Sequence, residues 1–165
     1  MSRPNTDQEN DGFLLGALLL IPAETLTKRV FEGFAAAGFP ELRPAHIPVF
    51  QLLKPNGDRI TDLAARARTT KQAMGYLVAH LEACGYVERV PDPSDGRAQL
   101  VRRTQRGWEV NRAARRLVKE VQDDWAVQMG AARMQQLLLL LQDLVRLIGV
   151  DQASSIASPS ARPKA

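Results

Sequence analysis

The fold is decided by residues 61–107, which read TDLAARARTTKQAMGYLVAHLEACGYVERVPDPSDGRAQLVRRTQRG. The first half predicts two short helices that are separated by a turn at Arg68 and Thr69. The second half predicts a β-hairpin, because two apolar runs flank a segment that is rich in Pro, Asp and Gly. The segment therefore combines two helices and a hairpin in one continuous unit.

The boundaries of the two helices follow from capping and stop signals. We expect the first helix over residues 62–67, with Thr61 as its N-cap, and the second helix to begin after Thr70, another N-cap candidate. Gly85 is placed to end the second helix in a left-handed conformation. The apolar side chains of the second helix recur at helical spacing and should face inward: Met74, Leu77, Val78 and Leu81.

The hairpin is predicted as strands 86–90 and 98–103 joined by a loop over residues 91–97. Thr104 should begin a long helix that runs to about residue 129, where Gly130 breaks it.

The outward face of the second helix has the composition that reading of a DNA groove requires. Lys71 and Gln72 can hydrogen-bond to base edges, and Ala73 can touch a thymine methyl group. Thr70 can cap the helix and donate to a phosphate. A helix–turn–helix followed by a hairpin indicates a winged helix. The simpler alternative is a surface helix that is polar on one side.

Charge distribution agrees with a polyanionic partner. Residues 54–116 contain 13 Lys and Arg against 7 Asp and Glu, whereas the whole chain has a net charge of +4. The rest of the chain is therefore slightly acidic, and the positive charge gathers around the predicted winged helix. A solvated surface of mixed charge is the alternative.

The flanking segments predict further helices. We expect a helical region over residues 13–37, in which Pro22 either kinks one helix or begins a second, and another helix over residues 44–53. From Met134 the chain is so apolar around its circumference that one neighbouring helix cannot cover it. In a chain of 165 residues, a second copy of the chain is the expected cover.

Several function classes have little support. A single Cys84 provides no disulfide framework, and His46 and His80 are too isolated in the sequence to indicate a metal site. No catalytic triad or phosphate-binding loop is recognisable, so we expect no enzyme activity and no cofactor. The apolar stretch at residues 13–21 is too short to span a bilayer and follows acidic residues, so we expect a cytoplasmic protein.

Residues 61–107 resemble the DNA-binding core of the MarR family, a group of bacterial winged-helix regulators. The hallmark of that family is a hairpin with two Asp and an Arg, followed by a strand that ends in Thr shortly before Gly. It is matched here by Asp92, Asp95, Arg97, Thr104 and Gly107. The likeness extends more weakly over residues 13–149. Two departures are that Ser94 or Gly96 stands where many relatives have a basic residue, and that Tyr76 stands where they often have Arg.

The resemblance implies a mainly α fold with a small β-hairpin wing, flanked by N- and C-terminal dimerisation helices. It implies one domain over residues 12–149, with a DNA-binding lobe at 45–107 and dimerisation helices at 13–37 and 107–149. Residues 1–11 and 150–165 would be disordered tails. The implied function is a homodimeric, ligand-responsive repressor that binds double-stranded DNA at a pseudo-palindromic operator.

The resemblance and the groove chemistry together give a set of predicted site residues. Arg97 would enter the minor groove, Asp95 would shape the wing tip by pairing with a basic neighbour, and basic residues at the strand end would contact the backbone. The predicted DNA-binding residues are Thr70, Lys71, Gln72, Ala73, Tyr76, His80, Asp95, Arg97, Arg102 and Arg103. A small aromatic effector would bind between the dimerisation helices and the lobe, near Phe34, Phe39, Phe50 and Trp125, although a plain core role is the alternative for each.

Two other functions stay open. A winged helix can serve protein association, and Cys84 could make the protein a redox-responsive regulator. Against the second, Cys84 lies at a predicted helix C-terminus, where the helix dipole disfavours a thiolate.

Overall fold

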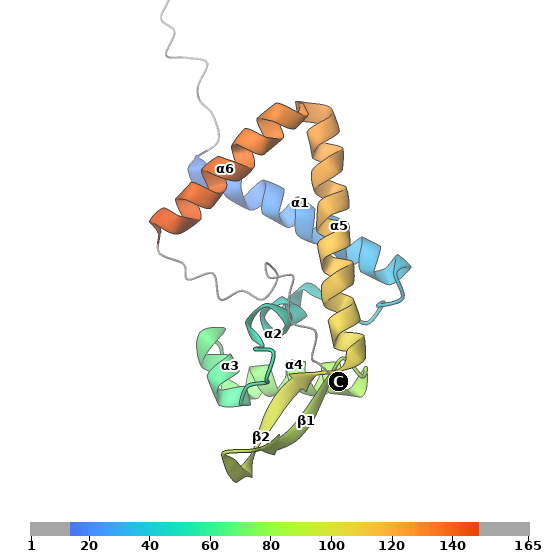
Figure 1. Cartoon of the computed structure of the whole chain (residues 1–165), viewed down its shortest axis with the longest axis vertical. Helices are drawn as coiled ribbons and strands as arrows, with labels where there is room; N and C mark the ends of the chain where they lie inside the picture. Colours follow the sequence, from blue (N-terminus) through green and yellow to red (C-terminus); the bar gives the residue numbers. More distant parts are fainter. Residues whose placement is uncertain (1–13, 149–165) are drawn as a thin grey trace, which may run out of the picture.

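The computed structural model describes residues 14–148, so the predicted tails at 1–11 and 150–165 lie outside the described residues. A lobe formed by α2, α3, α4 and a β-hairpin carries the long helices α1 and α5, and α6 folds back from the far end of α5 (Figure 1). The elements in chain order are α1 (Leu15–Ala36), a 3-10 helix (Pro44–His46), α2 (Ile47–Leu52), α3 (Ile60–Arg66), α4 (Lys71–Ala83), β1 (Val87–Asp92), β2 (Asp95–Arg103), α5 (Gln105–Met129) and α6 (Ala131–Leu147). The predicted mainly α class with a hairpin wing is confirmed.

The core of the lobe lies between α2, α3, α4 and the hairpin. The predicted apolar stripe of α4 is confirmed, since Met74, Val78 and Leu81 are fully buried and Leu77 is half-buried. Their partners from the other elements are also fully buried: Val49, Leu53, Leu63, Tyr86 and Val101. This packing fixes which side of α4 faces outward.

Two predicted helix boundaries need correction. Helix α3 begins at Ile60 after Arg59, so Thr61 lies inside the first turn, is exposed, and does not cap the helix. The segment predicted as one helix over 44–53 is a 3-10 turn followed by the short α2. Of the two alternatives for Pro22, the structure has one helix, because Pro22 lies within α1.

The hairpin is longer than predicted. Pro91 pairs with Gln99 and Asp92 with Asp95, with an irregularity in the register between Pro91 and Asp92. Most of the segment predicted as a loop is therefore strand. A two-stranded sheet has only edge strands, so a Pro without an N–H donor is tolerated there. We call this hairpin, Val87–Arg103, the wing.

The start of α5 is locked to the lobe by Thr104 and Gly107. The Thr104 hydroxyl accepts from the backbone N–H of Gly107 at 3.1 Å and donates to the carbonyl of Gly85 at 2.6 Å. A Cβ at Gly107 would stand only 2.1 Å from the Tyr86 carbonyl oxygen, so no larger residue fits without a shift. Gly85 has a φ of 75°, as its predicted role in ending α4 requires.

Candidate nucleic-acid interface

Helix α4 carries a polar outward face. Its N-cap is Thr70, as predicted, and the Thr70 hydroxyl accepts from the backbone N–H of Ala73 at 3.1 Å. The Tyr76 residue is 69% exposed, and its hydroxyl accepts from Gln72 Nε2 at 3.4 Å. The remaining predicted contact residues of α4 are exposed too: Lys71, Gln72, Ala73 and His80. This face is free for a groove because the apolar stripe occupies the opposite side of the helix.

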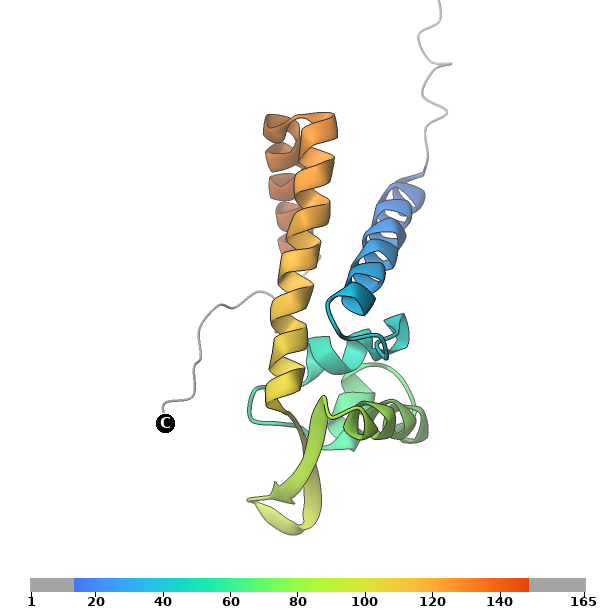
Figure 2. The same ribbon diagram turned by 90° about the vertical axis from the view of Figure 1, so that its right-hand side faces the viewer.

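An ion-pair cluster ties the wing to the start of α3. It supplies a basic partner for Asp95, as predicted, although neither Arg59 nor the part of Asp92 was predicted. The guanidinium of Arg59 pairs with Asp92 at 2.6 Å and with Asp95 at 3.5 Å. Asp92 is 7% exposed and also accepts from the backbone N–H and the hydroxyl of Ser94 at 2.8 and 2.7 Å. Helix α4 and the wing lie at the same end of the molecule, opposite the turn between α5 and α6 (Figure 2). The cluster therefore holds the wing beside the helix–turn–helix.

Hydrogen bonds from Ser94, together with Arg59, lower the pKa of Asp92 from 3.8 to about 2. Because the folded state lowers this pKa, the carboxylate stabilises the fold at pH above its ordinary value of 3.8, and this contribution is lost as the pH falls through about 2. We therefore expect Asp92→Asn to be less stable than wild type at neutral pH, with the difference shrinking at acid pH. Urea unfolding at a series of pH values measures this difference. A difference that stays constant down to pH 2 would contradict the role of the carboxylate charge.

Three cations near α4 and the wing have no acidic partner among the described residues. Arg97 is exposed, and only its backbone N–H bonds to the Asp95 carboxylate, at 3.1 Å. Lys71 lies in the first turn of α4, and Arg68 lies in the turn before it with a φ of 51°. By contrast, Arg102 pairs with Glu88 at 2.8 Å. Cations without carboxylate partners are available to phosphate groups.

The prediction that Arg103 contacts DNA needs correction. Arg103 is 3% exposed, donates to the carbonyl of Phe50 at 2.6 Å, and lies over the Trp108 ring at 4.8 Å. Burial lowers its pKa to about 10, while Asp58 acts in the opposite direction. Arg103 is therefore a packing residue of the lobe, and adjacent strand positions face opposite sides of the hairpin, which leaves Arg102 exposed.

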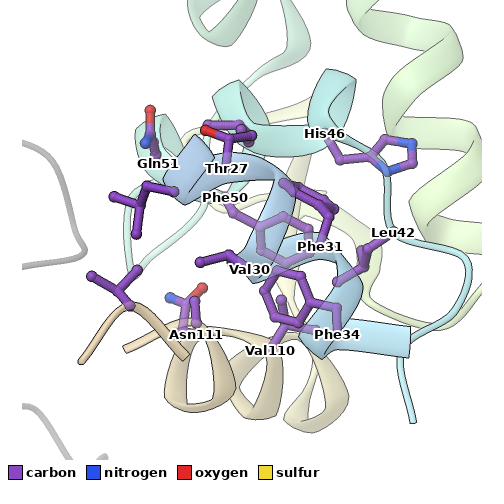
Figure 3. Close-up of a pocket in the computed structure, with 14 residues that line it drawn as sticks. Thr27, Val30, Phe31, Phe34, Leu42, His46, Phe50, Gln51, Val110 and Asn111 are labelled. Carbon is purple, nitrogen blue, oxygen red and sulfur yellow. The ribbon is translucent and has the colours of Figure 1, made fainter. Parts of the chain in front are cut away.

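A pocket of about 180 Å³ lies between α1, the α2 region and α5, as the close-up in Figure 3 shows. Phe34 and Phe50 from the predicted effector set line this pocket. Phe39 and Trp125 do not line it; Phe39 instead packs against Tyr86 and Phe34, with ring centroids 6.1 Å apart in both pairs. Phe31, which the sequence analysis did not single out, lines the pocket and meets Phe34 edge to face at 5.4 Å.

The two histidines are not isolated in space. The rings of His46 and His80 stack with centroids 4.9 Å apart and an interplanar angle of 12°. Cys84 is half-buried, and its Sγ lies 3.8 Å from His80 Nε2. Within residues 14–148, no group of three or more His, Cys, Asp or Glu side chains is arranged to hold a metal ion. In the same part of the chain, no helix has the length and apolar character that crossing a bilayer requires.

Comparison with known proteins finds sequences that match the lobe and a solved structure that is similar over most of the fold. A MarR family model matches residues 42–98. An HTH-type transcriptional regulator of Mycobacterium leprae is 41% identical over 66 residues, which are 40% of this chain and 43% of that relative. The transcriptional activatory protein BadR of Rhodopseudomonas palustris is 32% identical over 97 residues, 56% of this chain and 55% of BadR. This chain thus spans about half the length of the curated relatives it matches.

The likeness to a solved structure covers more of the molecule. The crystal structure of the MarR family protein Rv2887 of Mycobacterium tuberculosis, in complex with salicylic acid, is similar with a TM-score of 0.61 and 26% identity. The superposition covers 81% of this chain and 98% of that protein. The relative from Mycobacterium leprae and BadR are both named as proteins that regulate transcription. With the hallmark residues of its wing and the α1–α6 arrangement, this chain is similar to the MarR family of winged helix–turn–helix transcriptional regulators, whose family model matches its lobe.

Proposed function

We propose that this protein binds double-stranded DNA in the cytoplasm as a homodimer, with the lobe at residues 45–107 as its DNA-binding part. The observation that carries the proposal is the shared placement of α4 and the wing at one end of the molecule (Figure 2). Lys71 lies on α4, Arg97 on the wing, and Arg68 in the turn before α4. Helix α4 would enter the major groove and the wing the adjacent minor groove. Two-fold symmetry would set the two α4 helices about 34 Å apart on a pseudo-palindromic operator.

The homodimer is supported by apolar side chains at the other end. Helix α1 exposes Leu15 at 64% and Leu18 at 54%, and α6 exposes Leu140 at 60%. When several large apolar side chains are exposed together on a protein surface, that surface is typically a site of association with another molecule. We therefore assign dimerisation to α1 and to the α5–α6 segment.

Response to a small effector is supported by the position of the pocket. His46 lines the pocket and stacks on His80, which belongs to α4. A ligand that shifts His46 therefore acts on the helix proposed to read the major groove. Such a ligand would weaken DNA binding only if its affinity is higher for a dimer conformation that fits DNA poorly.

We further propose that the protein acts as a repressor. Repression requires only that the bound dimer excludes polymerase from the promoter, whereas activation requires a surface that engages polymerase. Transcription in vitro from a promoter that overlaps the selected site should fall when the protein is added. A rise in transcription would instead make the protein an activator. The relative BadR is named as a transcriptional activatory protein.

Selection of bound fragments from genomic DNA, followed by titration at several salt concentrations, tests DNA binding. Because phosphate contacts release counterions, affinity should fall by about 10³–10⁵-fold between roughly 50 and 200 mM salt if about 6–10 phosphates are contacted. Absence of any complex with the folded protein would favour a protein-association module. Loss of DNA binding on oxidation in wild type but not in Cys84→Ser would favour the redox-responsive regulator.

Arg97→Ala should weaken binding to the selected operator by about tenfold or more, because each protomer of the proposed dimer loses one charge-assisted contact. The thermal stability should hardly change, since the Arg97 side chain is exposed and forms no ion pair with a described residue. Fluorescence anisotropy measures the affinity, and thermal unfolding measures the stability. Arg43→Ala is the matched control, because Arg43 is exposed and lies outside both the lobe and the dimerisation helices. Equal affinities of both variants would remove the wing from the interface.

A further inference from the structure

The pocket between α1, the α2 region and α5 has a mainly apolar lining without charged side chains among the described residues. Its fourteen described lining residues include no Lys, Arg, Asp or Glu. Its walls are mainly aliphatic and aromatic, and its polar lining residues are Thr27, His46, Gln51 and Asn111. An apolar cavity of about 150 Å³ takes up a benzene molecule. The pocket of about 180 Å³ thus suits a single ring with one small substituent.

One polar group in this pocket is buried without a partner. Asn111 is 9% exposed, and no other described residue accepts a hydrogen bond from its Nδ2. Figure 3 shows the amide projecting from α5 toward Val30 on α1, at the cavity. A buried donor without an acceptor is unfavourable, because the group has given up its hydrogen bonds to water. An acceptor oxygen on a bound molecule would restore that hydrogen bond.

The other polar lining groups are engaged within the protein or uncharged. The Thr27 hydroxyl donates to the Ala23 carbonyl at 2.8 Å, and His46 Nδ1 accepts from the backbone N–H of Arg43 at 3.0 Å. Burial lowers the pKa of His46, and the neighbouring charges of His80 and Arg43 act in the same direction. The lowered pKa favours the neutral imidazole of His46, and the described lining offers no countercharge to an anion. Burying a carboxylate without a countercharge is strongly unfavourable.

We propose that this pocket binds a small neutral aromatic molecule whose carbonyl oxygen accepts a hydrogen bond from Asn111 Nδ2, and that it excludes the corresponding aromatic carboxylate. This inference rests on the effector response proposed above and names the chemical class of the effector. Asn111 favours ligands that carry a hydrogen-bond acceptor. The described lining residues include no cation, which disfavours negatively charged ligands.

Benzamide and benzoate provide the test, because they share size and shape and differ in charge at neutral pH. Calorimetric titration of the full chain should give an affinity for benzamide at least tenfold higher than for benzoate. Asn111→Leu should weaken benzamide binding at least fivefold without lowering the unfolding temperature, since Leu replaces a donor that has no described partner. Benzoate binding as tight as benzamide binding, unchanged benzamide affinity in Asn111→Leu, or no binding of either compound would overturn the inference.

A second measurement does not depend on the folding of the variant. In the wild type, the side-chain amide protons of Asn111 should shift downfield in ¹⁵N-resolved NMR spectra when benzamide is added, and no such shift would overturn the inference. Operator binding measured with and without benzamide separates this inference from the proposed function. If benzamide binds as expected but leaves operator affinity unchanged, the pocket assignment stands and the proposed effector response fails.

Discussion

Asp58→Asn should lower the free energy of unfolding by about 3 kcal/mol, because it removes the buried charge that joins three parts of the lobe. The Asp58 carboxylate pairs with Arg66 of α3 at 2.8 Å and accepts from the backbone N–H of Lys54 at 2.7 Å. The backbone of Asp58 is bonded twice to Val101 of β2, at 2.8 and 3.0 Å. The expected loss is at the lower end of the range for buried ion pairs, because the second cation, Lys54, has a side chain that is 65% exposed.

Denaturant unfolding monitored by circular dichroism measures this loss. The matched control is Asp123→Asn, which removes an exposed carboxylate that pairs with Lys119 on the surface of α5. Surface pairs of this kind contribute at most about 1 kcal/mol. If the two variants lose equal stability, the Asp58 cluster does not hold the lobe together.

The Asp58 cluster also shows what the sequence could not predict. The elements of the lobe were predicted from local signals, such as the Thr70 cap, the left-handed Gly85 and the apolar spacing of α4, and the structure confirms these. Asp58 and Arg103 carry no such signal, because their partners lie on other elements. A charged residue in a basic segment is expected at the surface, and only the packing of β2 against α2 shows that Arg103 is buried.

The residues of the candidate site likewise fall into two groups: those that local sequence signals predict and those that only the tertiary structure shows. The exposed face of α4 follows from helical periodicity, so its residues could be named before the structure was known. The Arg59–Asp92 pair joins residues 33 positions apart, and the stacked His46 and His80 belong to different helices. Likewise, the pocket takes residues from three segments, and Phe39 and Trp125 were assigned to it by residue type alone. Whether a residue lines the pocket or meets a partner on another element depends on the direction of its side chain. A single sequence does not specify that direction.

Leu140→Asp should convert the proposed dimer to monomers and weaken operator binding by about 10²–10⁴-fold, because two linked lobes then bind DNA as separate units. Leu140 is 60% exposed, so its replacement should cost the isolated protomer little stability. Its helix also exposes Leu139 at 49% and Leu147 at 83%. A carboxylate placed in such a surface opposes its burial against a second copy.

Sedimentation equilibrium measures the oligomeric state, and anisotropy measures operator affinity. Gln142→Asp is the matched control, since it adds the same charge to an exposed position about 200° around α6 from Leu140. The control should stay dimeric and keep its affinity, because the polar side of α6 is not expected to meet the second copy. Monomer formation by both variants would mean that added negative charge alone disrupts the assembly. A dimeric Leu140→Asp protein would show that the exposed leucines of α6 do not form the interface, and dimerisation would then have to be assigned to α1.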